Sequence, residues 1–173
     1  LDIHPCIGCY QCYNTGQCTF ADDMDRLIPA IAACRLLVVV SPVYTNGVPG
    51  ALKILIDRCQ ALHAARSFQG RDPGIRDQFT PPGSPYSGLL LATAGRAGQE
   101  HFLCVRRVIH AFLRNTGRIP YPPVFFDNMD AHRDIRDIPG AEHHVRGVTG
   151  DILTHQKEAG LNVGNLPPGN SVK

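Results

Sequence analysis

The sequence predicts an α/β fold in which a parallel sheet carries helices on both faces. Two short apolar runs, Leu36–Val40 and Gly88–Thr93, indicate buried strands, and segments with helical spacing alternate with them. This alternation is typical of parallel strands joined by right-handed crossovers. The length of 173 residues favours a single domain, which we expect to span residues 1–166 before a flexible tail at 167–173.

Each predicted element has its own local signal. Helices follow from apolar residues three and four positions apart, with Asp22 or Asp23 as an acidic N-cap and with Gly117 and Gly160 as stops. Strands follow from continuous apolar runs, and the Gly- and Pro-rich stretches predict loops. In chain order we predict a helix Met24–Ala32, a strand Leu36–Val40, a loop 41–47, a helix from Ala51 to about Gln60, a polar excursion 63–86, a strand Gly88–Thr93, a loop 94–98, a helix from about Gln99 to Asn115, a strand Val124–Phe126 and a helix from about Val148 to Ala159.

The composition argues against several classes of protein. Apolar residues make up 43% and charged residues 18%, which is a globular balance and not that of a disordered chain. The net charge of +2, without a block of Lys or Arg, argues against nucleic-acid or polybasic membrane binding. The apolar run Leu36–Val40 is too short to span a bilayer, and no signal peptide precedes it. We therefore expect a cytoplasmic protein.

Four of the seven cysteines are crowded into one short segment. Cys6, Cys9, Cys12 and Cys18 have the spacing C-x2-C-x2-C-x5-C, in which disulfides between neighbours would be strained. A cubane iron–sulfur cluster accepts such a run, and Gly8 and Gly16 let the backbone wrap closely around it. Zinc, which prefers two ligand pairs separated by a longer loop, and redox-active or merely structural thiols remain alternatives.

The other three cysteines and the histidines are interpreted as structural. Cys34, Cys59 and Cys104 lie in apolar helical patterns and are expected to be small buried residues. The pair His143-His144 has no partner at metal-ligand spacing and is expected at the surface.

Two loops follow the predicted strands at residues 41–47 and 93–99. In a parallel sheet, ligands bind outside the carboxyl ends of the strands, where these loops lie. Both loops are rich in Gly or Pro and poor in bulky charged residues, which suits a close approach of the backbone to a flat ligand. An ordinary turn between a strand and a helix is the alternative interpretation of each loop.

Three segments together resemble a known family. PCIGCYQC with a later Cys, then DDMD, then VVVSPVYTNGVPGALKILIDR are similar to the iron–sulfur flavoproteins of the flavodoxin-like NAD(P)H:FMN/quinone reductase superfamily. The resemblance implies a doubly wound flavodoxin-like sheet, an FMN and a [4Fe–4S] cluster. It also implies a ferredoxin-like electron donor and a homo-oligomer.

The resemblance also implies roles for individual residues. The cluster ligands would be Cys6, Cys9, Cys12 and Cys18, and Lys53, Asp57 and Arg58 would be helix-face and interface charges. Tyr44 could stack on the flavin ring or be a core or interface residue. The flavin ring would lie against two loops, made of Ser41, Pro42, Val43, Tyr44, Thr45, Asn46 and Gly47, and of Thr93, Ala94, Gly95, Arg96 and Gly98.

The start of the chain departs from this family pattern. Leu1-Asp2-Ile3 resembles the end of a second strand, so the first strand, the phosphate loop and the first helix of the family fold are absent from this sequence. Without that strand, Leu36–Val40 is expected to expose an apolar edge. A truncated sequence, a sheet completed by another chain and a lost flavin site are the three interpretations.

Three functions are compatible with these patterns. The leading hypothesis is an electron-transfer oxidoreductase that passes electrons between a [4Fe–4S] cluster and FMN, from a ferredoxin-like donor or NAD(P)H to a quinone, dioxygen or peroxide. It requires no catalytic side chain, because the cofactors supply the chemistry. The alternatives are an NAD(P)H-dependent FMN or quinone reductase without a cluster and a non-enzymatic cluster- or zinc-binding subunit of a redox complex.

Overall fold

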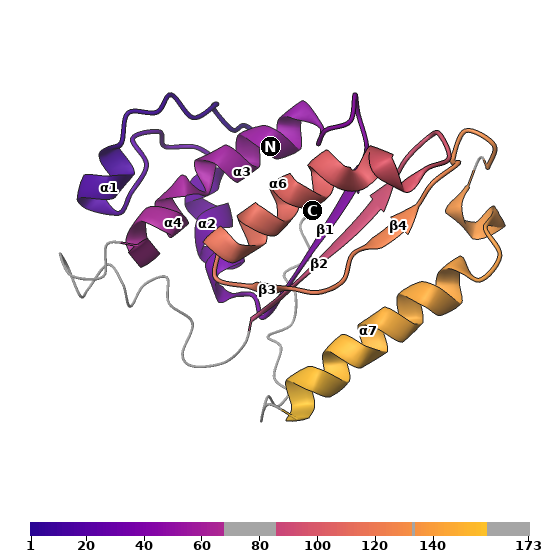
Figure 1. The fold of residues 1–173 in the computed structure, drawn as a ribbon. Helices are drawn as coiled ribbons and strands as arrows, with labels where there is room; N and C mark the ends of the chain where they lie inside the picture. Colours follow the sequence, from indigo (N-terminus) through magenta and orange to yellow (C-terminus); the bar gives the residue numbers. More distant parts are fainter. Residues whose placement is uncertain (68–85, 133, 159–173) are drawn as a thin grey trace.

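A four-stranded parallel sheet forms the centre of the computed structural model, which describes residues 1–67, 86–132 and 134–158 (Figure 1). The strand β2 is central and pairs in parallel with each of the other three strands. The register places Val39 beside Leu90 and Leu91 beside Val124. The strands are β1 (Leu36–Pro42), β2 (Ser87–Thr93), β3 (Ile119–Pro120) and β4 (Val124–Phe126).

Helices connect these strands and cover both faces of the sheet. They are α1 (Gln11–Thr15), α2 (Met24–Ala33), α3 (Gly50–Arg58), α4 (Gln60–Ser67), α6 (Leu103–Asn115) and α7 (Ala141–Glu158), with short 3-10 helices η1 (Gln99–Phe102) and η2 (Ile135–Asp137). Within the described segments, no helix combines the length and the apolar composition needed to cross a bilayer.

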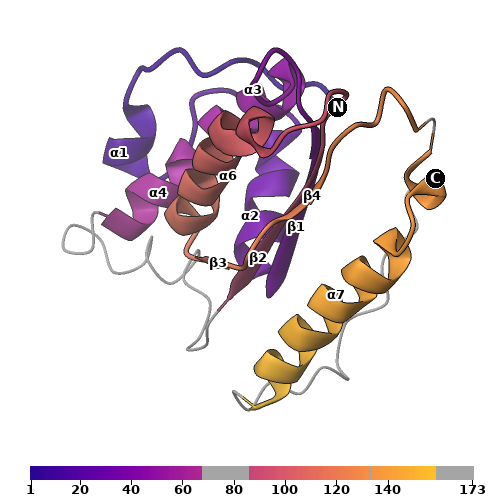
Figure 2. The same cartoon turned by 45° about the vertical axis from the view of Figure 1, so that its right-hand side comes forward.

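Two apolar cores lie on opposite faces of the sheet. Figure 2 shows α7 on one side of the strands and the other α-helices on the opposite side. The larger core joins Met24 of α2 and Leu62 of α4 to Leu90 of β2 and Ile109 of α6. The smaller core packs α7 through Ile152 against the other face. The predicted α/β architecture with helices on both faces is confirmed.

The strand β1 is less buried than the sequence predicts. Burial on both faces was the expectation for Leu36–Val40, but Val38 is 43% and Val40 71% exposed, while Val39 is buried. The prediction is wrong because, among the described residues, no helix covers this part of the sheet on the side of α7. The predicted free edge is confirmed separately, because β1 stands at the end of the described sheet and pairs only with β2.

Residues 1–3 do not form a strand. Asp2 instead pairs with the start of α2, because its N–H donates to the Asp23 carboxylate at 2.8 Å and its carbonyl accepts from the Asp23 N–H at 3.1 Å. The expectation that Leu1-Asp2-Ile3 ends a strand is therefore wrong for this structure. The two Asp2–Asp23 bonds bring the first residues of the chain beside the segment that follows the fourth cysteine.

Several element boundaries differ from the prediction. The predicted second helix is divided at Cys59 into α3 and α4, and α4 continues to Ser67, into the stretch expected to be an excursion. The last helix begins at Ala141 and not near Val148. Its first two turns already carry Ala141 and Val145 on the face that packs against the smaller core, a spacing that the sequence analysis missed. The rest of the predicted excursion, 68–85, and the tail lie outside the described residues.

The three remaining cysteines differ in burial. Cys59 is 3% exposed, as predicted for a small core residue. Cys34 is only partly buried, and Cys104 is exposed, so the prediction is wrong for these two. Cys104 lies beside the buried stripe of α6, which runs through Val105 and Ile109. The pair His143-His144 is exposed, as expected.

Candidate functional site

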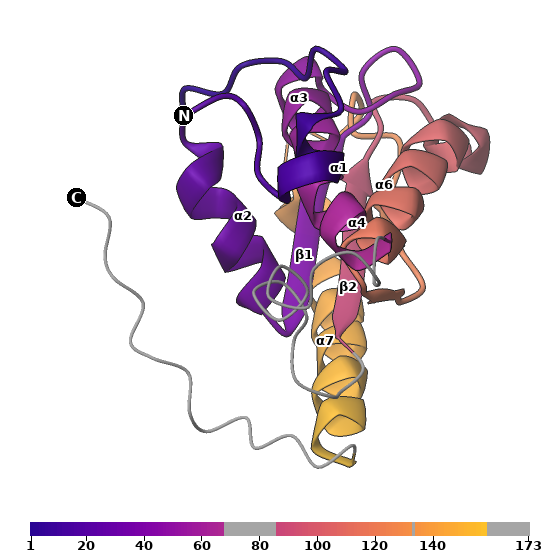
Figure 3. The ribbon, with the colours of Figure 1, turned by 90° about the vertical axis from the view of Figure 1, so that its left-hand side faces the viewer.

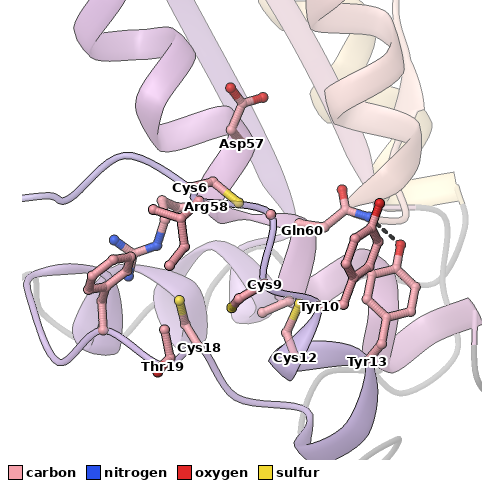
Figure 4. Close-up of a pocket in the computed structure, with 14 residues that line it drawn as sticks. Cys6, Cys9, Tyr10, Cys12, Tyr13, Cys18, Thr19, Asp57, Arg58 and Gln60 are labelled. Carbon is pink, nitrogen blue, oxygen red and sulfur yellow. Dashed lines mark hydrogen bonds between the residues drawn. The ribbon is translucent and has the colours of Figure 1, made fainter.

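The four clustered cysteines line one cavity of about 280 Å³. Figure 4 shows their thiols from the loop of residues 6–18, which we call the cysteine loop, above the junction of α3 and α4. Asp57, Arg58, Gln60 and Ala61 from that junction also line the cavity. All four thiols are free, and Cys6 and Cys9 are exposed while Cys12 and Cys18 are partly buried.

Left-handed backbone conformations shape the cysteine loop. Gly8 has a φ of 66°, Tyr10 of 58° and Gly16 of 73°, so the chain turns sharply before and after α1. Glycine adopts this region without strain, as the sequence analysis expects for Gly8 and Gly16. The short helix α1 packs against α4, which holds the loop over the larger core (Figure 3).

Burial and crowding of the thiols disfavour their ionisation when nothing is bound. Burial raises the pKa of Cys12, and the neighbouring Cys18, Cys6 and Cys9 raise it further, because thiolates placed close together repel one another. In the described part of the chain, no three Cys, His, Asp or Glu side chains converge as metal ligands do. The structure therefore brings the four thiols to one cavity without arranging them as a finished metal site.

Arg58, which lines this cavity, has one buried donor without a partner among the described residues. The Nε–H of Arg58 is buried and makes no hydrogen bond within the described residues. Four soft thiol ligands with a guanidinium group in the same cavity lining suit an iron–sulfur cluster, whose thiolate-bound form is anionic. The residues present thus fit an iron–sulfur cluster.

Arg58 is not the surface charge that its place in the family motif implies. It is 2% exposed, and its Nη1 donates to Asp22 Oδ2 at 2.5 Å and to the His4 carbonyl at 2.7 Å. Its Nη2 donates to Asp22 Oδ1 at 3.0 Å. The expectation of a helix-face or interface charge is therefore wrong for Arg58. It holds for Lys53 and Asp57, which form an exposed ion pair at 2.6 Å.

Helical spacing contains a signal for the burial of Arg58 that the sequence analysis missed. Ile54 and Leu55 lie one turn before it, and Ala61 and Leu62 lie one turn after it, so Arg58 occupies the apolar stripe. Its partner Asp22 was predicted only as an N-cap. The Asp22 carboxylate does accept the Met24 N–H at 3.0 Å, while Asp23 occupies the N-cap position of α2.

The first predicted flavin loop follows β1 at the carboxyl edge of the sheet. Ser41 and Pro42 close the strand, the Val43 N–H donates to the Thr93 carbonyl at 2.8 Å, and Tyr44 pairs with Gly47 around a tight turn. Thr45 and Asn46 in that turn have φ of 48° and 58°. Tyr44 is 63% exposed. The turn therefore presents its backbone and Tyr44 to a ligand outside the sheet.

The second predicted loop follows β2 and is bonded to the segment after β4. Ala94 donates to the Phe126 carbonyl at 2.9 Å, and the Gly98 N–H donates to the Asp127 carboxylate at 2.8 Å. Arg96 is exposed at the tip. Sequence reasoning missed Asp127, although its position directly after the strand Val124–Phe126 places it at the same edge.

The structure thus places the two loops side by side, since Val43 is bonded to Thr93, and the cysteine cavity lies at the other end of α3. Open loops at the carboxyl ends of parallel strands suit the flat ring of a flavin. Sheet, loops and cysteine cavity define the class of protein: a flavodoxin-like α/β domain with an added four-cysteine loop.

Comparison with known proteins agrees with this class. The family model for NADPH-dependent FMN reductase matches residues 1–103, and the chain belongs to that family. An iron–sulfur flavoprotein of Methanocaldococcus jannaschii is 38% identical over 73 residues, which are 42% of this chain and 38% of that protein. An iron–sulfur flavoprotein of Archaeoglobus fulgidus is 38% identical over 122 residues, 68% of this chain and 53% of that protein.

The chain therefore spans about half or less of the length of these two relatives. A solved structure described as an NADPH-quinone reductase of P. pentosaceus has a TM-score of 0.45 and 13% identity, with 90% of each chain covered. The flavodoxin-like resemblance stated from the sequence is confirmed by the family model and the two relatives.

Proposed function

We propose that this chain is part of an electron-transfer oxidoreductase that couples a [4Fe–4S] cluster to FMN. The observation that carries the proposal is the single cavity lined by Cys6, Cys9, Cys12 and Cys18 on a domain of the FMN reductase family. The donor would be a ferredoxin-like protein or NAD(P)H, and the acceptor a quinone, dioxygen or peroxide. Two relatives that are named iron–sulfur flavoproteins support the pairing of the two cofactors.

The residues of the chain would hold and orient the two groups. When bound, the cluster supplies one-electron chemistry and the flavin both one- and two-electron chemistry. The four cysteines would bind the cluster as thiolates. The backbone amides of residues 45–46 and 95–97, whose neighbours in the two loops are already bonded within the domain, would hydrogen-bond the flavin ring and stabilise negative charge on it. Tyr44, exposed beside the turn, would contact the ring face.

A reductase without a cluster is the second candidate. It is favoured by the description of the matching family, NADPH-dependent FMN reductase, which requires no cluster. It is also favoured by the absence of converged metal ligands among the described residues. In that case the cysteine loop would be structural, and FMN would take its electrons directly from NADPH.

Cofactor analysis separates these functions. The chain is purified without oxygen, and iron, sulfide and flavin per chain are measured with the absorption spectrum. Iron with sulfide and flavin supports the proposal, whereas flavin alone supports the cluster-free reductase. Metal without flavin would instead identify a cluster- or zinc-binding subunit.

Two matched cysteine variants assign the metal ligands. Cys9→Ala should lose the iron because it removes one of the four cavity thiols. Cys104→Ala removes an exposed thiol of α6 that does not line the cavity, and it should retain the iron. Equal iron content in the two variants would contradict the ligand assignment.

The assembly follows from the same proposal. Family resemblance suggests a homo-oligomer, and Ile7 and Tyr10 of the cysteine loop are 66% and 71% exposed. Light scattering of the chain, with and without reconstituted cofactors, measures its mass. A monomer under both conditions would contradict this part of the proposal.

A further inference from the structure

One guanidinium group closes the base of the cysteine loop. Arg58 binds the carbonyl of His4, two residues before Cys6, and the carboxylate of Asp22, four residues after Cys18. We call residues 2–4 and 22–23 the loop neck. Within it the His4 N–H donates to Asp22 at 3.0 Å, and Asp2 is bonded to Asp23. The segment that holds all four cysteines thus has its two ends fixed to each other through α3.

The ion pair that closes the neck is desolvated, although Asp2 and His4 of the neck are exposed. The side chains of Arg58 and Asp22 are 1% and 2% exposed. Phe20 stacks on the His4 ring at 5.0 Å, and the guanidinium carbon of Arg58 lies 5.2 Å from the centre of the Phe20 ring. Removing either partner of a buried bidentate ion pair destabilises the fold strongly, because the remaining charge is buried without solvent or a counter-charge.

Within the ion pair, the positive partner lies on the cysteine side. Arg58 lines the cavity together with the four thiols, and Asp22 does not. Arg58 keeps its charge, because a guanidinium is not deprotonated in proteins and both of its Nη groups are bonded to the Asp22 carboxylate. The other charged group in the lining is Asp57, which is half exposed and paired with Lys53.

We infer that Arg58 is the positioning residue of the cluster site: it fixes the ends of the cysteine loop and holds a positive charge beside the thiols. The inference deepens the proposed function and rests on it. A bound cluster would gain one negative charge on one-electron reduction by a donor of the ferredoxin class. The fixed guanidinium of Arg58, in the same cavity lining as the four thiols, would stabilise that added charge.

A purely structural role makes a different prediction. If Arg58 and Asp22 only hold the loop together, Arg58→Gln and Asp22→Asn break the same contact and change the cluster in the same way. If the charge acts on the cluster, the two variants shift its midpoint potential in opposite directions. Arg58→Gln removes the favourable charge and lowers the potential, whereas Asp22→Asn removes the opposing charge and raises it.

The test is a redox titration of the reconstituted full chain, monitored by electron paramagnetic resonance. We expect each variant to change the equilibrium constant for reduction at least tenfold, which is a shift of about 59 mV for a one-electron couple. Arg26→Gln is the matched control, since it neutralises an exposed arginine paired with Asp23 beside the neck. It should leave the potential unchanged, because exposed charges are screened. Shifts of the same sign for Arg58→Gln and Asp22→Asn, or no shifts, would overturn the inference.

Iron retention tests the positioning role separately. Arg58→Lys keeps the charge but loses the two-pronged contact with Asp22, so its potential should stay near that of the wild type. Its iron should pass to a chelator at least severalfold faster, because the neck is weakened. Retention equal to the wild type would contradict the positioning role. If circular dichroism shows that Arg58→Gln does not fold, Asp22→Asn still tests the effect of charge on the potential. Arg58→Lys then still tests the positioning role through iron retention.

Failure of this inference is distinct from failure of the proposed function. A wild-type chain that binds no iron after reconstitution, behaving like Cys9→Ala, contradicts the cluster assignment itself. A wild-type chain that binds the cluster, but whose potential does not respond to changes at Arg58 and Asp22, contradicts only the electrostatic role of the arginine.

Discussion

Replacing Gly88 by Ala tests how closely α6 packs on the central strand. Gly88 lies in β2 between Leu37 and Pro120 of the neighbouring strands, and it is buried. A Cβ at this position would lie 2.5 Å and 2.7 Å from the two methyl carbons of Leu113 and 2.9 Å from its Cγ. Leu113 has no exposed surface, so it cannot turn into solvent to make room.

The size of the effect follows from these distances. Carbon atoms pack at about 3.5–4.0 Å, so α6 or Leu113 would have to move by about 1 Å. Overpacking of this kind costs about 1–3 kcal/mol, and a lower entropy of the unfolded chain offsets about 0.4–1 kcal/mol of that. Gly88→Ala should therefore lower the free energy of unfolding, by up to about 2.6 kcal/mol.

A double-mutant cycle in urea measures the packing term. Leu113→Ala alone should cost about 2–5 kcal/mol through the cavity that it leaves. With both changes, the new methyl group occupies part of that cavity, so the double variant should be at least about 1 kcal/mol more stable than additivity predicts. Gly147→Ala is the control, since nothing lies within 4 Å of its Cβ. Additive effects at Gly88 and Leu113 would refute the close packing.

Three further predictions concern charge, exposure and thiol reactivity. The hydrogen bond from Arg58 lowers the pKa of Asp22 below its usual 3.8. The ionised Asp22 carboxylate therefore stabilises the fold fully above about pH 5, and this stabilisation is lost as the pH falls. Urea midpoints should decline on acidification, and they should decline less steeply in Asp22→Asn. Val40→Thr should change the unfolding free energy by less than about 0.5 kcal/mol, whereas Val39→Ala should lower it by about 1–3 kcal/mol. Iodoacetamide should alkylate exposed Cys104 quickly, as mass spectrometry of peptides would show, and leave Cys59 unmodified, since burial raises the pKa of Cys59 to about 12.

The order of the elements was predictable because it depends on local patterns. Buried strands such as Gly88–Thr93 are continuous apolar runs, and the buried stripe of α6 repeats every three to four residues. The four-cysteine spacing likewise requires no knowledge of the fold. The cysteines line one cavity because α1 and two left-handed glycines turn the chain within this short span.

Features that depend on distant partners were not predictable in the same way. The residue type of Arg58 predicts a charge at the surface. Its burial is favourable only because of its contacts with His4 and Asp22, which are far away in the sequence. The exposure of Val40 depends on which helix covers β1, and a single strand pattern carries no information about that. The boundary at Ala141 was missed because the first turns of α7 offer only Ala141 and Val145 among polar residues, a sparse version of the helical pattern that continues at Val148 and Ile152.

The closed neck makes the cysteine loop separable from the rest of the domain. Because Asp2 and Asp23 are hydrogen-bonded to each other, the chain leaves and re-enters the fold at almost the same point. A relative could exchange this excursion for a short turn without disturbing the sheet. Arg58 could not remain unchanged in such a protein, because it would be a buried cation without its carboxylate. Across the family, the four cysteines and this arginine should therefore be gained and lost together.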